Sequence, residues 1–176
     1  LTPSRNPSMD RTAIEQLLEE VLGVDRILWL NHGYLAGDDT DSHIDTLARF
    51  CAPDHICYVS CPDVADEHYS ALAAMEEELQ EFRQADGAPY KLTPLPWPDA
   101  IHDEDGERLP ATYANFLITN EKILLPIYGC DTDQQAIDAL QSVSGDRQVT
   151  PVNCRVLIEQ HGSLHCVTMQ LPRGAV

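Results

Sequence analysis

Two short segments of the sequence carry side chains whose chemistry is complementary. Residues 37–45 read Gly-Asp-Asp-Thr-Asp-Ser-His-Ile-Asp and hold four carboxylates and one imidazole. Residues 162–166 read Gly-Ser-Leu-His-Cys and end on a thiol. A carboxylate binds a planar cation such as a guanidinium, and a thiolate attacks an electrophilic carbon. We therefore predict that the two segments meet in space and hold a cationic, planar substrate against a nucleophilic thiolate.

The acidic segment also has plainer interpretations, which stay open. Most runs of charge are solvated loops, and Asp38, Asp39 and Asp41 fit that interpretation. His43 and Asp45 fit it less well, because a strand-like run follows at once and alternation directs both side chains to one face. The rival interpretation is a divalent-cation site built from Asp38, Asp39, His43 and Asp45. The segment lacks the regular ligand spacing of a calcium loop, so we predict no metal.

Cys166 is the candidate nucleophile. A thiol that attacks carbon needs a neighbouring base, and the sequence offers His43, His161 and His165. On a strand, His165 and Cys166 would point to opposite faces, which favours His43 as the partner and a packed or hydrogen-bonded structural role for His165. Gly162 lies in the loop before Cys166 and allows close approach of the backbone. We predict buried structural roles for the other cysteines, which are Cys51, Cys57, Cys61, Cys130 and Cys154.

Composition limits the class of protein that these segments can serve. Of the 176 residues, 43% are hydrophobic and 23% are charged, as in an ordinary globular domain. The sequence has no apolar run long enough for a membrane span, no signal peptide and no paired Cys-x-x-Cys, so we expect a cytoplasmic protein with reduced thiols. The balance of 29 acidic to 11 basic residues gives a net charge of -18, which argues against a nucleic-acid partner. The same charge is compatible with a cationic substrate, although solubility explains it equally well.

The N-terminal residues predict one helix followed by one strand. Apolar residues recur at helical spacing from 13 to 22, Ser8 or Asp10 can cap the helix, and Gly23 can end it. Residues 26–30, Arg-Ile-Leu-Trp-Leu, predict a buried strand whose end leads towards the acidic segment.

A ββαβ pattern then occurs twice along the chain. In the first unit we expect strands at 46–51 and 56–60, a helix at 66–83 and a strand at 90–95. The apolar face of that helix is expected to consist of Leu72, Met75, Leu79 and Phe82. In the second unit we expect strands at 114–119 and 122–127, a helix at 133–143 and a strand at 148–152.

This repeat has a consequence for the whole fold. The two hairpins begin alike, with Ala48-Arg49-Phe50 and Ala114-Asn115-Phe116, 66 residues apart. A third copy is expected to begin around residues 165–171. One ββαβ unit cannot bury its apolar face alone and must stack on neighbours. We therefore predict an α/β protein that makes up about half of a larger repeat fold, with coincidental similarity of the two hairpins as the alternative.

Three motifs, in this order, resemble a known family. Residues 37–45, residues 109–116 (Leu-Pro-Ala-Thr-Tyr-Ala-Asn-Phe) and residues 162–168 (Gly-Ser-Leu-His-Cys-Val-Thr) resemble the agmatine deiminases and the related bacterial peptidylarginine deiminases. The resemblance covers essentially the whole chain. It implies a partial pentein, an α/β propeller of repeated ββαβ units with the active site at its centre. Residues 1–176 would then be the C-terminal portion of a single catalytic domain, with the N-terminal half absent.

The resemblance also implies a reaction and a set of residues. The reaction is hydrolysis of agmatine, a small cationic guanidine, to N-carbamoylputrescine and ammonia, a step towards putrescine and other polyamines, without metal or cofactor. Cys166 resembles the nucleophile that forms an amidino-thioether, and His43 resembles the general acid and base. Asp45 resembles one of two carboxylates that hold the guanidinium. Asp39 resembles the residue that meets the distal amine, which favours agmatine over arginine.

Two departures from the family pattern bear on these expectations. The family often has a run of glycines before the nucleophile, where this chain reads Gln160-His161-Gly162, so Gly162 is the position we assign to substrate binding there. The family's second guanidinium-binding Asp lies in an N-terminal half, so we predict that this chain alone is inactive. The alternatives are a deiminase of peptidyl or free arginine, and a catalytically silent pentein module that binds a guanidine. The sequence leaves open whether the chain forms a homo-oligomer.

Overall fold

The computed structural model describes residues 5–38, 43–171 and 174 of the chain. The chain divides into two compact units, Leu1–Leu30 and Asn31–Val176, and each is described by itself. Within the described ranges, none of the helices combines the length and the apolar character that a membrane span requires.

The first unit contains the predicted helix, α1 (Arg11–Leu22). Asp10 caps it by accepting a 2.9 Å hydrogen bond from the backbone N–H of Ala13. Gly23 ends it in the left-handed conformation, with φ at 65°, and donates its N–H to the carbonyl of Glu19. Of the two predicted caps, Asp10 is therefore the one that the chain uses, and the predicted stop at Gly23 is confirmed.

The predicted strand at residues 26–30 is wrong, because these residues form no strand. Trp29 lies against α1 instead. Its indole Nε1 donates a 2.5 Å hydrogen bond to the carboxylate of Glu15, and the guanidinium of Arg11 lies 4.6 Å from the centre of its ring. A short apolar run serves equally well as a strand or as a cover for a helix, and periodicity cannot separate the two.

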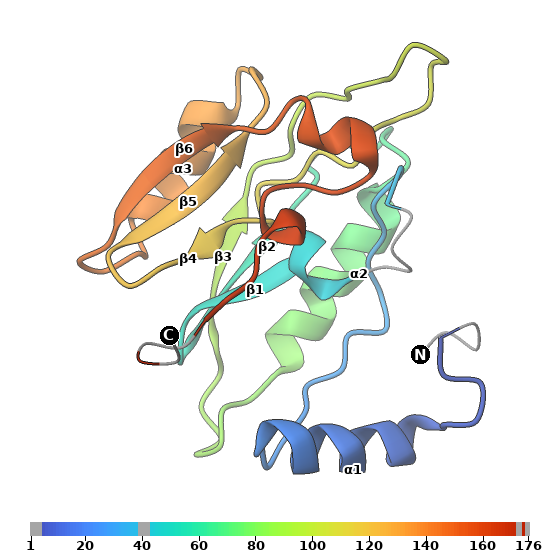
Figure 1. Ribbon diagram of the computed structural model, residues 1–176, viewed down its shortest axis with the longest axis vertical. Coiled ribbons are helices and arrows are strands. Elements are labelled where there is room, and N and C mark those ends of the chain that lie inside the picture. Colours follow the sequence, from blue (N-terminus) through green and yellow to red (C-terminus); the bar gives the residue numbers. More distant parts are fainter. Residues whose placement is uncertain (1–4, 39–42, 172–173, 175–176) are drawn as a thin grey trace. The chain divides into compact units, whose positions relative to one another are not determined.

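The second unit contains two three-stranded sheets of the same design (Figure 1). The first sheet has the order β1 (Ala48–Ala52), β2 (His55–Val59), β3 (Lys91–Leu95). The second has the order β4 (Leu117–Ile118), β5 (Lys122–Ile127), β6 (Gln148–Asn153). In each sheet the first two strands are antiparallel and the third is parallel to the second. A helix connects the second strand to the third, α2 (Tyr69–Glu81) in one sheet and α3 (Asp133–Gln141) in the other. The predicted ββαβ repeat is confirmed.

The repeat extends to single residues in the third strand of each sheet. Pro94 in β3 lies opposite Tyr58 of β2, and Pro151 in β6 lies opposite Leu125 of β5. Both strands are at the end of their sheet's order, where a proline without an N–H removes no ladder bond. The described residues contain these two ββαβ repeats, and the repeats do not form a closed ring.

The helices bury short apolar faces. α2 buries Leu72, Met75 and Leu79, as predicted, but the helix ends at Glu81, so Phe82 follows it and is only half-buried. The predicted start at 66 is also too early. Asp66 accepts the backbone N–H of His68 in a local turn, and such a turn competes with the first turn of a helix.

α3 connects the two repeat units. It contacts β6 of its own sheet and β3 of the other sheet. Its buried residues are Ala136 and Leu140. The compact unit Asn31–Val176 therefore buries apolar surface between its two ββαβ repeats, as the repeat pattern predicts.

The expected third copy at residues 165–171 is wrong. Residues His165–Val167 form a 3₁₀ turn, η3, and the described residues after it form no strand. The backbone N–H of His165 bonds to the side chain of the buried Asn115 at 2.7 Å instead of to a neighbouring strand. The same N–H also approaches the backbone carbonyl of Asn115 at 3.3 Å, so Asn115 supplies both acceptors where a strand would use a sheet ladder.

Candidate active site

The structure places the candidate carboxylate beside the candidate thiol. Asp45 lies in the 3₁₀ turn η1 (Ile44–Thr46), and Cys166 lies in η3. The Sγ of Cys166 is 4.0 Å from Oδ2 of Asp45, although 121 positions separate them in sequence. The Nδ1 of His165 lies 2.7 Å from the same oxygen. Two distant segments thus meet at one carboxylate, which exposes 17% of its side chain.

Asn115 joins the two segments and is completely buried. Its Nδ2 donates to the carbonyl oxygen of Asp45 at 3.2 Å and to Oδ2 of Asp45 at 3.0 Å. Its Oδ1 accepts the backbone N–H of His165 and lies 3.6 Å from Sγ of Cys166. The sequence reasoning missed this residue. The available signal was a polar side chain at the start of an apolar hairpin, since such residues are buried only with hydrogen-bond partners.

The two candidate histidines lie in different surroundings. His165 is hydrogen-bonded, as predicted, but it contacts Asp45 rather than pointing away from the site. The reason is η3, since successive side chains on a 3₁₀ turn lie about 120° apart and not on opposite faces. His43 is exposed, and its carbonyl accepts from the backbone and hydroxyl of Thr46. Within the described residues, its imidazole forms no hydrogen bond or ion pair.

The other two predicted positions have different outcomes. Asp39 lies outside the described residues. Gly162 packs closely against the candidate nucleophile, because a Cβ built on it would lie 3.2 Å from Cβ and 3.8 Å from Sγ of Cys166. Glycine therefore leaves the room that the Cys166 side chain occupies.

The start of the acidic segment is anchored on three sides. Gly37 has φ at 77°, and a Cβ on it would lie 2.3 Å from the carbonyl oxygen of Arg108, so only glycine fits there. The carbonyl of Gly37 lies 2.8 Å from Nδ1 of His161, which itself adopts the left-handed conformation. The backbone N–H of Ala36 donates to Nε2 of the buried His68 at 2.8 Å. The chain therefore enters the acidic segment from a fixed position.

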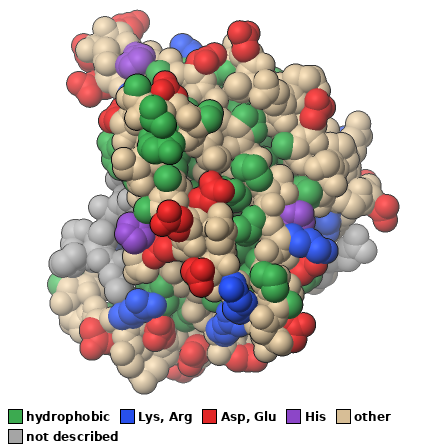
Figure 2. Space-filling view, turned by 180° about the vertical axis from the view of Figure 1, so that it is seen from behind, with side chains coloured by type: hydrophobic (Ala, Val, Ile, Leu, Met, Phe, Trp, Pro, Cys, Tyr) green, Lys and Arg blue, Asp and Glu red, His purple; other side chains and the backbone are tan. Residues whose placement is uncertain are grey.

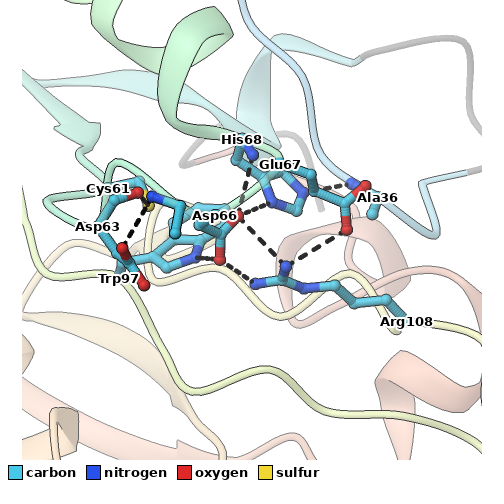
Figure 3. A network of polar contacts seen from close by, with 9 residues as sticks. Ala36, Cys61, Asp63, Asp66, Glu67, His68, Trp97 and Arg108 are labelled. Atoms are coloured by element: carbon cyan, nitrogen blue, oxygen red, sulfur yellow. Dashed lines mark hydrogen bonds and ion pairs between the residues drawn. The ribbon is translucent and has the colours of Figure 1, made fainter.

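Behind this anchor lies a polar network centred on Asp66 (Figure 3). Because Nε2 of His68 accepts from Ala36, its Nδ1 carries the proton and donates it to Asp66 at 2.6 Å. Trp97 and Arg108 donate to the other oxygen of Asp66 at 3.2 and 2.9 Å. Burial alone raises the pKa of Asp66, but the hydrogen bonds from Arg108 and His68 outweigh it and hold the pKa well below its usual range. Asp66 is therefore a carboxylate at neutral pH.

Arg49 brings a positive charge towards the site. It lies in β1, donates to the carbonyl of Phe116, and has its guanidinium 5.1 Å from the centre of the Phe116 ring. Burial lowers the pKa of Arg49, whereas the charges of Asp45 and Cys166 raise it.

The acidic side chains of the surface and the possible metal ligands were both compared with this site. Figure 2 shows acidic side chains spread over one face of the molecule and not gathered in a single patch. Such an arrangement produces a diffuse negative field. Among the described residues, no group of three or more His, Cys, Asp or Glu side chains is placed to hold a metal ion.

The comparison with known protein families identifies the chain's relatives. Residues 1–172 match the family described as Porphyromonas-type peptidyl-arginine deiminase. The chain belongs to this family. Its mixed α/β fold also matches solved structures of agmatine deiminases.

Individual members of the family show how much is shared. A protein of Vibrio parahaemolyticus described as a "Putative agmatine deiminase" is 34% identical over 188 residues, which cover 98% of this chain and 52% of the relative. The crystal structure of the "Putative Arginine Deiminase" from Porphyromonas gingivalis superposes with a TM-score of 0.94 at 56% identity, covering 98% of this chain and 50% of that one. The agmatine deiminase of C. jejuni with substrate bound superposes with a TM-score of 0.87 at 39% identity, covering 94% and 47%. The chain spans about half the length of the curated relatives that it matches.

Proposed function

We propose that the chain carries the thiol-bearing part of a guanidine-hydrolysing active site, and that the substrate is agmatine. The observation that supports this most directly is the approach of Cys166 to Asp45, at 4.0 Å. A carboxylate can hold a guanidinium beside a thiol that can attack it. Cys166 is also the exposed cysteine, whereas the other five are buried or half-buried. The relatives described as agmatine deiminases supply the substrate class.

The proposed reaction has two covalent steps. The sulfur of Cys166 bonds to the guanidinium carbon, and the bond from that carbon to one terminal nitrogen breaks, so that ammonia leaves and an amidino-thioether remains. Water then adds to the same carbon and the C–S bond breaks, which releases N-carbamoylputrescine and restores the sulfur. His43 would give the proton to the leaving nitrogen and take one from the water, as the family resemblance implies.

The remaining binding roles are part of the same proposal. Asp45 would hold the guanidinium, Gly162 would line the substrate beside the thiol, and Asp39 would meet the distal amine. A second carboxylate would come from sequence outside this chain, and no metal or cofactor takes part. The two ββαβ units would be neighbouring blades of a pentein propeller completed by that same sequence.

A second substrate class has its own support. The family's description names peptidyl-arginine, and the P. gingivalis relative is described as an arginine deiminase. Arginine and arginyl peptides carry the same guanidinium but have a carboxylate or a peptide bond where agmatine has none. A comparison of kcat/KM for agmatine, arginine and an arginyl peptide separates the candidates.

The test is ammonia release from agmatine. It is measured with this chain and with the extended protein, by which we mean the chain lengthened upstream along its gene to the length of its relatives. We expect release by the extended protein alone, and at least a thousandfold loss in its Cys166→Ala variant. Cys130→Ala is the matched control, because Cys130 is half-buried and carries no proposed role. If the extended protein releases no ammonia from any of the three substrates, the proposed function is wrong.

A further inference from the structure

We propose that Asn115 is the positioning residue of this site, and that with His165 it commits one oxygen of Asp45 to the protein and leaves the other for the substrate. This inference rests on the proposed function for the identity of the substrate. The arrangement of Asn115 itself does not depend on it.

The neighbours of the Asn115 amide determine its orientation. The two atoms of Asp45 near Asn115 are a carbonyl oxygen and a carboxylate oxygen, and both only accept hydrogen bonds. The atom of His165 near Asn115 is a backbone N–H, which only donates. The amide therefore directs its NH₂ to Asp45 and its oxygen to His165. Neither an ionised carboxylate nor an apolar side chain at this position could meet both demands.

The two carboxylate oxygens of Asp45 differ in their hydrogen bonds to the protein. Oδ2 accepts from Nδ2 of Asn115 at 3.0 Å and from Nδ1 of His165 at 2.7 Å, and Cys166 approaches the same atom. Oδ1 accepts no hydrogen bond from the described residues. A guanidinium that enters the site would therefore bond through Oδ1, while Oδ2 keeps the carboxylate from turning.

Asn115 also bears on the distance between the carboxylate of Asp45 and the thiol of Cys166. Asn115 bonds to η1 through Asp45 and to η3 through His165, so one buried side chain spans the two segments. Its Oδ1 also lies 3.6 Å from Sγ of Cys166. Asn115 thus sets both the direction of the carboxylate and its separation from the sulfur, and displacement of a reacting group by about 1 Å can cost about a hundredfold in rate.

The turnover test uses one variant of Asn115 and two variants of opposite design at His165. In Asn115→Asp the shape is kept, but an acceptor replaces the NH₂ that Asp45 needs. We expect about a hundredfold loss of kcat/KM for agmatine in the extended protein. His165→Asn keeps a donor near the place of Nδ1 and should lose less than about tenfold, whereas His165→Leu removes the donor and should lose about a hundredfold. Ser144→Ala is the control, since Ser144 is buried and, among the described residues, bonds only to Gln141 and Arg147.

A second readout does not need turnover. The rate at which iodoacetamide alkylates Cys166 is followed by mass spectrometry in each variant. Asn115→Leu is close to Asn in size, adds no charge and removes the bonds that join η1 to η3, so Cys166 should be alkylated about tenfold faster at neutral pH, while Ser144→Ala should match the parent.

The two readouts separate this inference from the proposed function. The inference is supported by loss of turnover in Asn115→Asp and His165→Leu, a loss of less than about tenfold in His165→Asn, and parent activity in Ser144→Ala. Turnover in Asn115→Asp within about threefold of the parent, or equal losses in both His165 variants, overturns it. If the parent has no deiminase activity at all, the proposed function fails, and the alkylation rate of Cys166 alone tests the positioning role of Asn115. Faster alkylation in Asn115→Leu then supports the positioning role, and an unchanged rate overturns it.

Discussion

Replacing Asp66 by Asn should destabilise the protein strongly, although Asp66 is remote in sequence from both chemical segments. Three donors converge on Oδ1 of Asp66, from the backbone and ring of His68 and from Arg108, and two on Oδ2, from Trp97 and Arg108. Whichever way an amide at this position turns, its NH₂ faces at least two donors. The change also removes the charge that Arg108 opposes, and Arg108 exposes only 16% of its side chain.

The magnitude follows from the burial of this pair. Removing one partner of a buried ion pair costs about 3–5 kcal/mol. Arg108 keeps a longer contact with Glu67 at 3.4 Å, so we expect the low end, about 3 kcal/mol in the free energy of unfolding. Asp54→Asn is the matched control. Asp54 and Lys91 lie 2.8 Å apart, as close as Asp66 and Arg108, but they expose 40% and 69% of their side chains. A pair this exposed contributes little, so the control should stay close to the parent.

The assay is urea denaturation of the extended protein, followed by tryptophan fluorescence, as a function of pH. The pKa of Asp66 is depressed in the folded state, so the unfolded state takes up a proton at a higher pH than the folded state does. The advantage of the parent over Asp66→Asn should therefore be complete above about pH 4 and shrink as the pH falls below it. A loss below about 1 kcal/mol at neutral pH, or a loss no larger than that of Asp54→Asn, would refute the reasoning from burial.

Two further predictions concern the acidic segment. Asp45→Asn removes the charge that would hold the guanidinium while roughly keeping its shape, and it should lower kcat/KM for agmatine at least a thousandfold; residual activity above about a thousandth of the parent would count against the role of Asp45. Gly37→Ala places a methyl group 2.3 Å from the carbonyl of Arg108, whereas Gly129→Ala meets nothing within 4 Å at almost the same φ. Both carry the conformational cost of a positive φ, so thermal denaturation should show Gly37→Ala to be the less stable by about 1–3 kcal/mol, and equal stabilities would contradict the close contact.

Local sequence determined the ends of α1, the two ββαβ repeats and the residue types of the candidate site. The cap at Asp10 and the stop at Gly23 use bonds that reach at most four residues along the chain, so neighbouring residues suffice to predict them. The two ββαβ units follow from the alternation of apolar residues and from turns, which are also local. The residue types that could do the chemistry, a carboxylate at 45 and a thiol at 166, were evident for the same reason.

Only the tertiary structure decided how those residues are held. Asn115 bonds to residues 70 positions before it and 50 positions after it, and no local pattern contains such pairs. His165 joins the site from η3, where its backbone N–H bonds to the side chain and the carbonyl of the buried Asn115, whereas alternation predicted a strand. Trp29 covers a helix where apolar periodicity predicted a strand. In each case a polar partner distant in sequence, or contact with a neighbouring helix, outweighs the local preference, because a buried polar group without a partner costs more than local propensity supplies.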